Sequence, residues 1–101
     1  MQCMYKLKGF MITFGTEKNE LLKQSRGIGF EDIISAINAG KILDVLEHPD
    51  QANYPGQKIY VVEALDYVYL VPFVKSDNGV FLKTIIPSRK AKKRYKGEGN
   101  V

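Results

Sequence analysis

The stretch from residue 58 to residue 86 most constrains the fold, because it contains three β-type segments with short connections between them. Residues 58–64 and 67–74 are rich in aromatic and β-branched side chains, which are typical of strands. Ser-Asp-Asn-Gly at residues 76–79 is the strongest turn signal in the chain, and it predicts a hairpin onto a third strand over residues 80–86. Strands joined by such short turns form an antiparallel sheet.

Two helices are predicted ahead of this sheet. Thr16 is the expected N-cap of a helix over residues 17–25, and Gly27 can adopt the left-handed conformation that often ends a helix. In the next segment, apolar residues recur at the spacing of one helical face, namely Phe30, Ile33, Ile34 and Ile37. Gly40 ends this second helix. A tight turn at residues 27–29 makes the two helices a hairpin.

The remaining segments complete an α+β fold. Residues 11–14 form a short strand at the edge of the sheet in this interpretation, and residues 41–47 form a strand after the second helix. Pro72 lacks the backbone N–H that a central strand needs, so it indicates a sheet edge or a bulge. The helices precede the main sheet along the chain, and this order is typical of the α+β class.

Length and composition indicate one domain of 101 residues. Residues 1–10 carry no clear structural pattern, and residues 97–101 are expected to be a tail. The single cysteine, Cys3, and the single histidine, His48, argue against a disulfide framework and a metal site, so we expect neither a metal nor a cofactor. We find no long apolar run of the kind that makes a signal peptide or a membrane span, and we therefore expect a cytoplasmic protein.

The excess positive charge of the chain is concentrated in one C-terminal segment, residues 89–96. Six of the 15 basic side chains lie there with no acidic residue, so the nine basic residues elsewhere are outnumbered by 11 acidic ones. A concentrated basic patch on a near-neutral body predicts a polyanionic partner, most simply a nucleic acid. The competing interpretation is a solvated, lysine-rich tail.

Two segments of the chain carry a recognisable pattern of residues. The first contains Glu17-Lys18-Asn19, then Lys23, then Arg26-Gly27-Ile28-Gly29-Phe30-Glu31-Asp32. The second is Ile85-Ile86-Pro87-Ser88-Arg89-Lys90-Ala91-Lys92-Lys93. In this order, and with an antiparallel sheet between them, the two segments resemble the front and the C-terminal signature of the BrnT-type toxins.

The resemblance to BrnT-type toxins implies a RelE-like fold, with two helices packed on a small antiparallel sheet and a short basic helix at the C-terminus. It further implies a toxin of a type II toxin–antitoxin pair, an endoribonuclease that cleaves RNA without a metal and arrests translation and growth. The expected partners are the RNA substrate and a cognate antitoxin protein. Operator DNA is then contacted only through the antitoxin.

The chain departs from the family pattern at several positions. Arg26 stands where the family often has histidine, and Gly29 replaces a serine whose hydroxyl would cap the second helix. Pro87 and Ser88 replace the serine and alanine of the C-terminal signature. Tyr95 occupies a position that is often glutamate in the family, so a carboxylate-based mechanism is not carried over.

Metal-free RNA cleavage needs a base for the 2′-hydroxyl, positive charge at the phosphate and a proton donor for the departing 5′-oxygen. Arg89 is the candidate for the phosphate, because its planar fork matches two phosphate oxygens; the alternative is a surface arginine that pairs with a carboxylate such as Glu31. Lys93 or Lys90 is the candidate base, because crowded cations disfavour one another's charged forms; the alternative is a solvated lysine. Tyr95 is the candidate proton donor or base-stacking group, and the alternative is packing of the last helix on the sheet.

The other cations are candidates for contact with RNA, and the alternative for each is an ordinary surface side chain: Lys18, Lys58, Lys83, Lys92 and Arg94. His48 is expected to be a solvated or hydrogen-bonded loop residue. Four aromatic residues are expected to form core and cross-strand pairs rather than base-stacking surfaces: Tyr60, Tyr67, Tyr69 and Phe73.

Two other functions fit the same sequence. A non-catalytic RNA- or DNA-binding module would use the same cations, because phosphate binding and phosphate cleavage need the same positive charge. A domain that keeps the toxin fold but acts only through a protein partner would show no salt-sensitive affinity for RNA. The endoribonuclease toxin is the leading interpretation.

Overall fold

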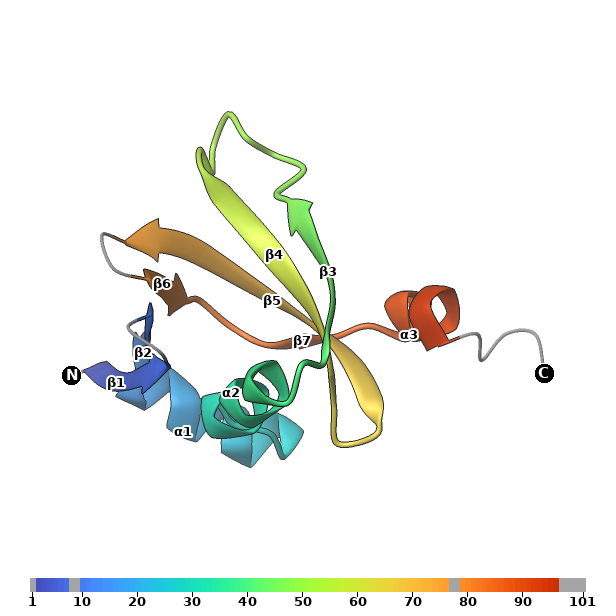
Figure 1. Cartoon of the computed structure of the whole chain (residues 1–101), viewed down its shortest axis with the longest axis horizontal. Helices are drawn as coiled ribbons and strands as arrows, with labels where there is room; N and C mark the ends of the chain where they lie inside the picture. Colours follow the sequence, from blue (N-terminus) through green and yellow to red (C-terminus); the bar gives the residue numbers. More distant parts are fainter. Residues whose placement is uncertain (1, 8–9, 77–78, 97–101) are drawn as a thin grey trace.

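A computed structural model describes residues 2–7, 10–76 and 79–96 of the chain (Figure 1). The elements follow in the order β1 (Gln2–Leu7), β2 (Phe10–Gly15), α1 (Thr16–Arg26), α2 (Phe30–Asn38), β3 (Ile42–Glu47), β4 (Gln57–Ala64), β5 (Tyr67–Ser76), β6 (Gly79–Leu82), β7 (Ile86–Pro87) and α3 (Arg89–Lys96). The α+β class and the basic C-terminal helix are confirmed. Residues 77–78 of the turn expected at residues 76–79, and the tail expected at residues 97–101, lie outside the described residues.

The strands form a mixed sheet in the order β1-β2-β6-β5-β4-β3, and the short strand β7 pairs with β5. The described pairs are antiparallel except for β2 with β6, which are parallel. The expectation of a wholly antiparallel sheet is therefore wrong. Along the chain, β2 is separated from β6 by the helices α1 and α2 and by strands β3 to β5. Parallel neighbours require such a long connection.

Strand β2 lies inside the sheet rather than at its edge, which corrects the prediction for residues 11–14. On its outer side, β1 pairs with it in antiparallel register. On its inner side, Gly79 of β6 lies so close that a Cβ atom there would overlap the backbone of Met11. The glycine of the predicted hairpin is therefore also the residue that lets β6 pair with β2.

The two helix predictions are confirmed, with one correction at the start of α1. This helix begins at Thr16 with Gly15 at its N-cap, so the N-cap lies one residue earlier than predicted. At its end, Gly27 adopts the left-handed conformation, with φ of 68°, and donates its backbone N–H to the carbonyl oxygen of Lys23. The predicted apolar stripe of α2 faces the core: Phe30, Ile33, Ile34 and Ile37.

Pro72 lies in the interior strand β5, so the sheet-edge alternative is wrong and a bulge accounts for this residue. Between β6 and β7, residues 83–85 stand opposite residues 71–72 of β5, which leaves one residue in excess. The pairing is thus interrupted where Pro72 has no N–H to donate, while its carbonyl oxygen accepts the N–H of Lys83 at 2.8 Å. For the same reason, the strand predicted over residues 80–86 is divided into β6 and β7.

The sheet has two faces with different coverings. Alternate residues of a strand point to opposite faces of its sheet. Val62 of β4 belongs to the large core under α1 and α2, whereas its neighbour Val61 belongs to a small cluster under α3. The large core also contains Phe14 and Phe30, whose rings stack with their centroids 4.9 Å apart. The basic helix α3 therefore lies on the face opposite the first two helices, and Figure 1 shows it apart from them.

The aromatic residues of β4 and β5 pack as predicted. Tyr60 stacks on Phe73 of the neighbouring strand, with the ring centroids 4.0 Å apart. Tyr67 meets Tyr69 edge to face at 5.6 Å. All four rings belong to the large core or pack against it, which confirms the prediction of core and cross-strand pairs.

Candidate functional site

The basic helix α3 is fixed to the sheet at its first turn. The backbone N–H of Ser88 donates to the carbonyl oxygen of Val68 in β5 at 3.0 Å. The Ser88 hydroxyl oxygen accepts the backbone N–H of Ala91 at 3.1 Å, as the side chain of an N-cap residue does. Ser88 therefore caps α3 and joins its start to β5.

One side of α3 packs on the sheet through Ala91 and Tyr95, which lie about one helical turn apart. Ala91 is buried in the cluster that contains Val61, and the Tyr95 ring packs against the same cluster. The Tyr95 hydroxyl donates a hydrogen bond to Oδ2 of Asp44, on the edge strand β3, at 2.8 Å. Tyr95 therefore has a packing role, which was the alternative to proton donation.

Asp44 is a member of this site that sequence patterns did not single out. Its carboxylate accepts the Tyr95 hydroxyl and, through Oδ1, the backbone N–H of Val45 at 2.8 Å. The hydrogen bond from Tyr95, followed by that from Val45, holds the pKa of Asp44 below its usual range. The same hydrogen bond raises the pKa of Tyr95, which makes its phenol a weaker proton donor. The sequence signal that could have identified Asp44 is the presence of an acidic residue within an otherwise apolar strand.

A pocket of about 230 Å³ opens between α3 and the sheet. Its lining combines apolar residues of β3, β4 and β5 with residues of α3, among them Leu46, Val61, Leu70, Lys90, Arg94 and Tyr95. Lys90 and Arg94 lie about one turn apart on one flank of the helix and are both exposed. The pocket therefore has an apolar floor and two positive charges on one side.

Arg89 and Lys93, the first candidates for the phosphate contact and the base, are not among the residues that line this pocket. Both are exposed, and the helical period turns them away from the side of α3 that packs on the sheet. Glu31, the carboxylate named as an example of a partner for Arg89, is instead bound by Asn19 and Lys23 between α1 and α2. Of the four catalytic candidates, the structure brings Lys90 and Tyr95 to the pocket.

Two of the cations proposed for RNA contact lie on α3, on different flanks. Arg94 lines the pocket, and its guanidinium carbon lies 5.5 Å from the centroid of the Tyr95 ring. On the other flank, Nζ of Lys92 lies 5.0 Å from the centroid of the Tyr67 ring, within the range of a cation–π contact. A polyanion that follows α3 therefore meets positive charge on both flanks as well as on the outward side.

The other three cations proposed for RNA contact lie outside α3, and two of them, Lys18 and Lys58, lie on the opposite side of the sheet. Lys18 is exposed on α1, which covers the opposite face of the sheet. Lys58 lies on the same face of β4 as Tyr60, because alternate residues share a face, and that face is also opposite α3. Lys83 is exposed in the interruption between β6 and β7.

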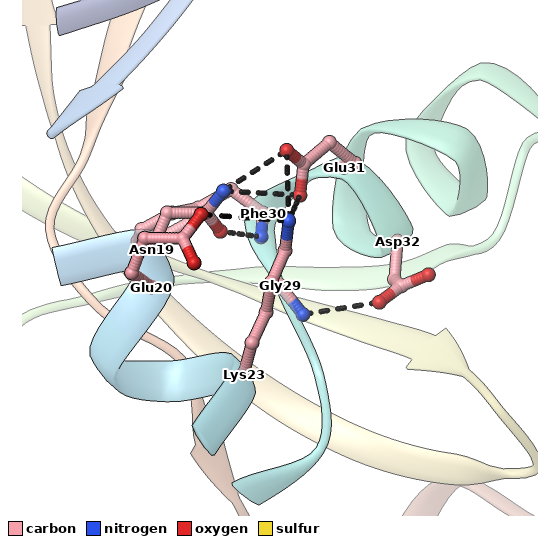
Figure 2. Close-up of polar contacts among 7 residues, drawn as sticks. All are labelled: Asn19, Glu20, Lys23, Gly29, Phe30, Glu31 and Asp32. Carbon is pink, nitrogen blue, oxygen red and sulfur yellow. Dashed lines mark hydrogen bonds and ion pairs between the residues drawn. The ribbon is translucent and has the colours of Figure 1, made fainter. Parts of the chain in front are cut away.

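The front segment of the family resemblance forms a polar cluster between α1 and α2 (Figure 2). Asn19 of α1 is 2% exposed, and its side-chain oxygen accepts the backbone N–H of Phe30 at 2.6 Å. Its side-chain nitrogen donates to both carboxylate oxygens of Glu31, at 3.1 and 2.9 Å. Asn19 thus accepts a backbone N–H at the start of α2, the helix end where Gly29 lacks the hydroxyl that a serine would supply.

Gly29 leaves the space that this cluster needs. A Cβ atom at Gly29 would lie 2.6 Å from Cε of Lys23 and 2.9 Å from Oδ1 of Asn19. Its backbone N–H is accepted by Oδ2 of Asp32 at 3.0 Å. Burial raises the pKa of Glu31, but hydrogen bonds from Asn19, from its own backbone N–H and from Lys23 outweigh burial and hold that pKa below its usual range. The cluster is fully paired and joins the two helices.

A second pocket, of about 290 Å³, lies beside the end of α2 and is larger than the pocket at α3. Asp32 and Glu63 contribute carboxylates to its lining, with Lys41 as the one basic residue there. Negative charge repels the polyanion that the basic segment predicts. The smaller pocket beside α3 is therefore the better candidate for the functional site.

His48 has the loop role expected of it. Its Nδ1 accepts the backbone N–H of Asp50 at 3.0 Å, and its ring lies 4.4 Å from that of Tyr54 between centroids. Within residues 2–7, 10–76 and 79–96, no group of three or more His, Cys, Asp or Glu side chains is placed to hold a metal ion. The described helices also lack the length and apolar character needed to cross a membrane.

Comparison of the chain with protein-family models, with curated proteins and with solved structures finds no match. What the chain does is therefore inferred from the geometry around α3 and from the resemblance that the two sequence segments carry.

Proposed function

We propose that this chain is the ribonuclease toxin of a type II toxin–antitoxin pair, of the kind that the resemblance to BrnT-type toxins implies. The observation that supports the proposal best is the position of α3, which places Lys90 and Arg94 beside a pocket with an apolar floor. Such a site suits RNA, because the cations can bind phosphate while the floor contacts a sugar or a base.

The way α3 is held on the sheet favours binding of a polyanion. Ala91 and the cap at Ser88 attach the helix, so its positive charges are already arranged before RNA arrives. Preorganised groups lose less entropy on binding than groups that must be ordered first. Arg94 can bind two phosphate oxygens at once through its planar fork, whereas Lys90 acts as a point charge.

The reaction that we propose is attack of an RNA 2′-oxygen on the adjacent phosphorus. The 2′-hydroxyl gives its proton to water, and the 2′-oxygen bonds to phosphorus as the bond from phosphorus to the 5′-oxygen breaks. The products are a 2′,3′-cyclic phosphate and a 5′-hydroxyl, which takes its proton from water. Lys90 and Arg94 are assigned to the negative charge that grows on the phosphate. Arg89 and Lys93 face outward, so we assign them to flanking phosphates instead of the reacting group.

A non-catalytic nucleic-acid-binding domain is the second candidate, and the contact between Tyr95 and Asp44 favours it. The Tyr95 hydroxyl donates to the Asp44 carboxylate, and this bond raises the pKa of the phenol. Cleavage needs a proton donor and a proton acceptor, whereas binding needs only the cations.

Two matched double variants test the proposal. Lys90→Gln with Arg94→Gln removes two charges beside the pocket, and Arg89→Gln with Lys93→Gln removes two charges at the same spacing on the outward side. We expect the induced wild type to arrest growth and shorten cellular RNA. The pocket variant should relieve both effects and slow cleavage of a labelled RNA by about a hundredfold, and the outward variant should slow it much less.

The purified proteins separate cleavage from binding. Far-ultraviolet circular dichroism shows whether each variant is folded, and the cleavage assay contains EDTA because we expect a metal-independent reaction. Normal growth and intact RNA with the wild type would contradict the toxin proposal. Salt-sensitive RNA binding without any shortening of RNA would instead favour the non-catalytic domain, with the salt slope reduced by about two in the pocket variant.

A further inference from the structure

We infer that the pocket beside α3 holds one unpaired nucleobase, so that the chain acts on single-stranded rather than duplex RNA. This inference rests on the proposed function and narrows its substrate class. It also assigns a role to Leu46, an apolar residue of the edge strand β3 that the folded core does not bury.

The size and lining of the pocket suit a flat apolar group. Its volume of about 230 Å³ lies below the range of about 300–1,000 Å³ that holds whole drug-sized ligands. Leu46, Val61 and Leu70 line it from the strands, and Ala91 lines it from the helix. Every nucleobase has an apolar face, and contact with that face binds bases without requiring a particular sequence.

The charges of the site give a bound nucleotide one orientation. Lys90 and Arg94 lie on the α3 side of the pocket, whereas Leu46 and Leu70 belong to strands on the other side. A phosphate placed against the two cations therefore directs its base toward the apolar strands. In this orientation the phosphate contacts the two cations and the base contacts apolar side chains. The opposite orientation leaves the phosphate on an apolar surface.

A paired base cannot enter a recess between a helix and a sheet. In duplex RNA, each base is stacked on both faces and hydrogen-bonded along its Watson–Crick edge. Proteins that recognise individual RNA bases therefore mostly bind single strands, loops and ends, where a base can be turned out of the stack. A duplex can still contact the outward cations Arg89 and Lys93, but it cannot fill the pocket.

The edge of β3 beside the pocket is poorly suited to a protein strand as the occupant. The backbone N–H of Val45 is already bound by the Asp44 carboxylate, and the register of β3 shifts between Ile42 and Asp44. Irregular register and an occupied N–H both hinder addition of another strand to a sheet edge. Together with the positive flank, this edge favours RNA over a pairing polypeptide.

The chain offers a matched pair of variants for the test. Leu46 and Val45 are adjacent on β3, are 36% and 46% exposed, and point to opposite faces of the sheet. Leu46→Asp places a charge in the pocket, and Val45→Asp places the same charge on the same strand outside it. Leu46→Ala serves as a milder second variant, and thermal unfolding shows whether each variant is folded.

The probe is a short single-stranded RNA with 2-aminopurine as the reporter base and 2′-O-methyl groups, which prevent cleavage through the 2′-oxygen. We expect the wild type to bind this probe at least tenfold more tightly than its duplex, with a change in 2-aminopurine fluorescence. Leu46→Asp should weaken binding by about tenfold to a hundredfold. Val45→Asp should weaken it by less than about threefold, and Leu46→Ala should fall between the two.

The possible outcomes separate this inference from the proposed function. Equal binding of single strand and duplex, or equal losses in Leu46→Asp and Val45→Asp, would overturn the nucleobase site even if the wild type cleaves RNA. The expected binding pattern without cleavage would support the site and contradict the ribonuclease. A wild-type dimer that Leu46→Asp dissociates, with unchanged RNA affinity, would show that the pocket seats a second copy and not a base.

Discussion

The face of the sheet under α1 and α2 carries the large core, with rings such as Phe14 and Phe30 fully buried. The face under α3 carries only a small cluster, which buries Val61 and Ala91, and the basic pocket opens beside it. Burial of apolar surface is the dominant favourable contribution to folding. The comparison indicates that the large core under α1 and α2 contributes most of the stability, and that the face under α3, with its small cluster, is available for binding.

Each face also has one carboxylate that joins a helix to the rest of the molecule. Glu31 is bound by Asn19 and Lys23 on the side of α1 and α2. Asp44 is bound by Tyr95 and by a backbone N–H at the margin of the α3 side. The first carboxylate connects two helices beside a large core, whereas the second holds a helix that has few other contacts with buried residues.

The largest expected difference between the faces is in core substitutions. Phe30→Ala should lower the free energy of unfolding by about 3–5 kcal/mol, because it empties a fully buried site. Leu70→Ala, at a half-buried position on the α3 side, should cost only about 1 kcal/mol. Urea denaturation followed by circular dichroism measures both values. Equal losses in the free energy of unfolding would show that the two faces contribute equally to stability, contrary to this prediction.

A smaller effect is expected at the start of α2, where two physical arguments disagree. A serine at position 29 would restore a capping hydroxyl, which alone is worth about 1 kcal/mol of stability. Its Cβ would lie within 3 Å of Oδ1 of Asn19, which already caps Phe30. We therefore expect Gly29→Ser to destabilise the protein by about 1–3 kcal/mol.

The double variant Asn19→Ala with Gly29→Ser distinguishes these arguments. Asn19→Ala alone leaves the N–H of Phe30 without its partner, and we expect it to cost about 1–3 kcal/mol. Removing Asn19 takes away one of the three side-chain atoms that crowd position 29, and the other two, Cε of Lys23 and Oε1 of Glu31, belong to flexible side chains that can move aside for a capping serine. The cost of Gly29→Ser should therefore shrink in the Asn19→Ala background, and strict additivity in denaturation measurements would contradict the crowding argument.

The smallest effect is expected from Tyr95→Phe on the α3 side. It removes the main hydrogen bond to Asp44, so the pKa of Asp44 should rise toward its usual range while global unfolding changes little. NMR titration of the Asp44 carboxyl group measures this change. An unaltered pKa would show that the bond to Tyr95 is not formed in solution.

The same contact predicts the pH range in which α3 is held most firmly. The pKa of Asp44 is lower in the folded state, so its stabilising contribution is present above the unfolded value of about 4 and is lost as the pH falls through the lowered folded value. The pKa of Tyr95 is raised, so its contribution is present below about 10 and is lost as the pH rises through the raised value. NMR signals of Ala91 should therefore change at both extremes, and less in Tyr95→Phe.

Local sequence patterns alone determined the helices, the hairpin and the charge of the C-terminal segment. The apolar stripe that begins at Phe30, the left-handed Gly27 and the turn signal at residues 76–79 each depend on neighbours within a few positions. The composition of residues 89–96 predicted a basic segment in the same way, and its helical form was what the family resemblance implied. Patterns of this kind are readable because the spacing of residues along one element decides which of its sides is buried.

Only the tertiary structure decided which elements meet. It made β2 a parallel neighbour of β6, put α3 on the face opposite the first helices, and joined Asp44 to Tyr95 across a separation of 51 residues. It also selected Lys90 and Arg94 as the cations at the pocket and turned Arg89 and Lys93 outward. Periodicity shows that a face is buried but not what covers it, because the covering element is chosen by packing between segments that are distant in the sequence.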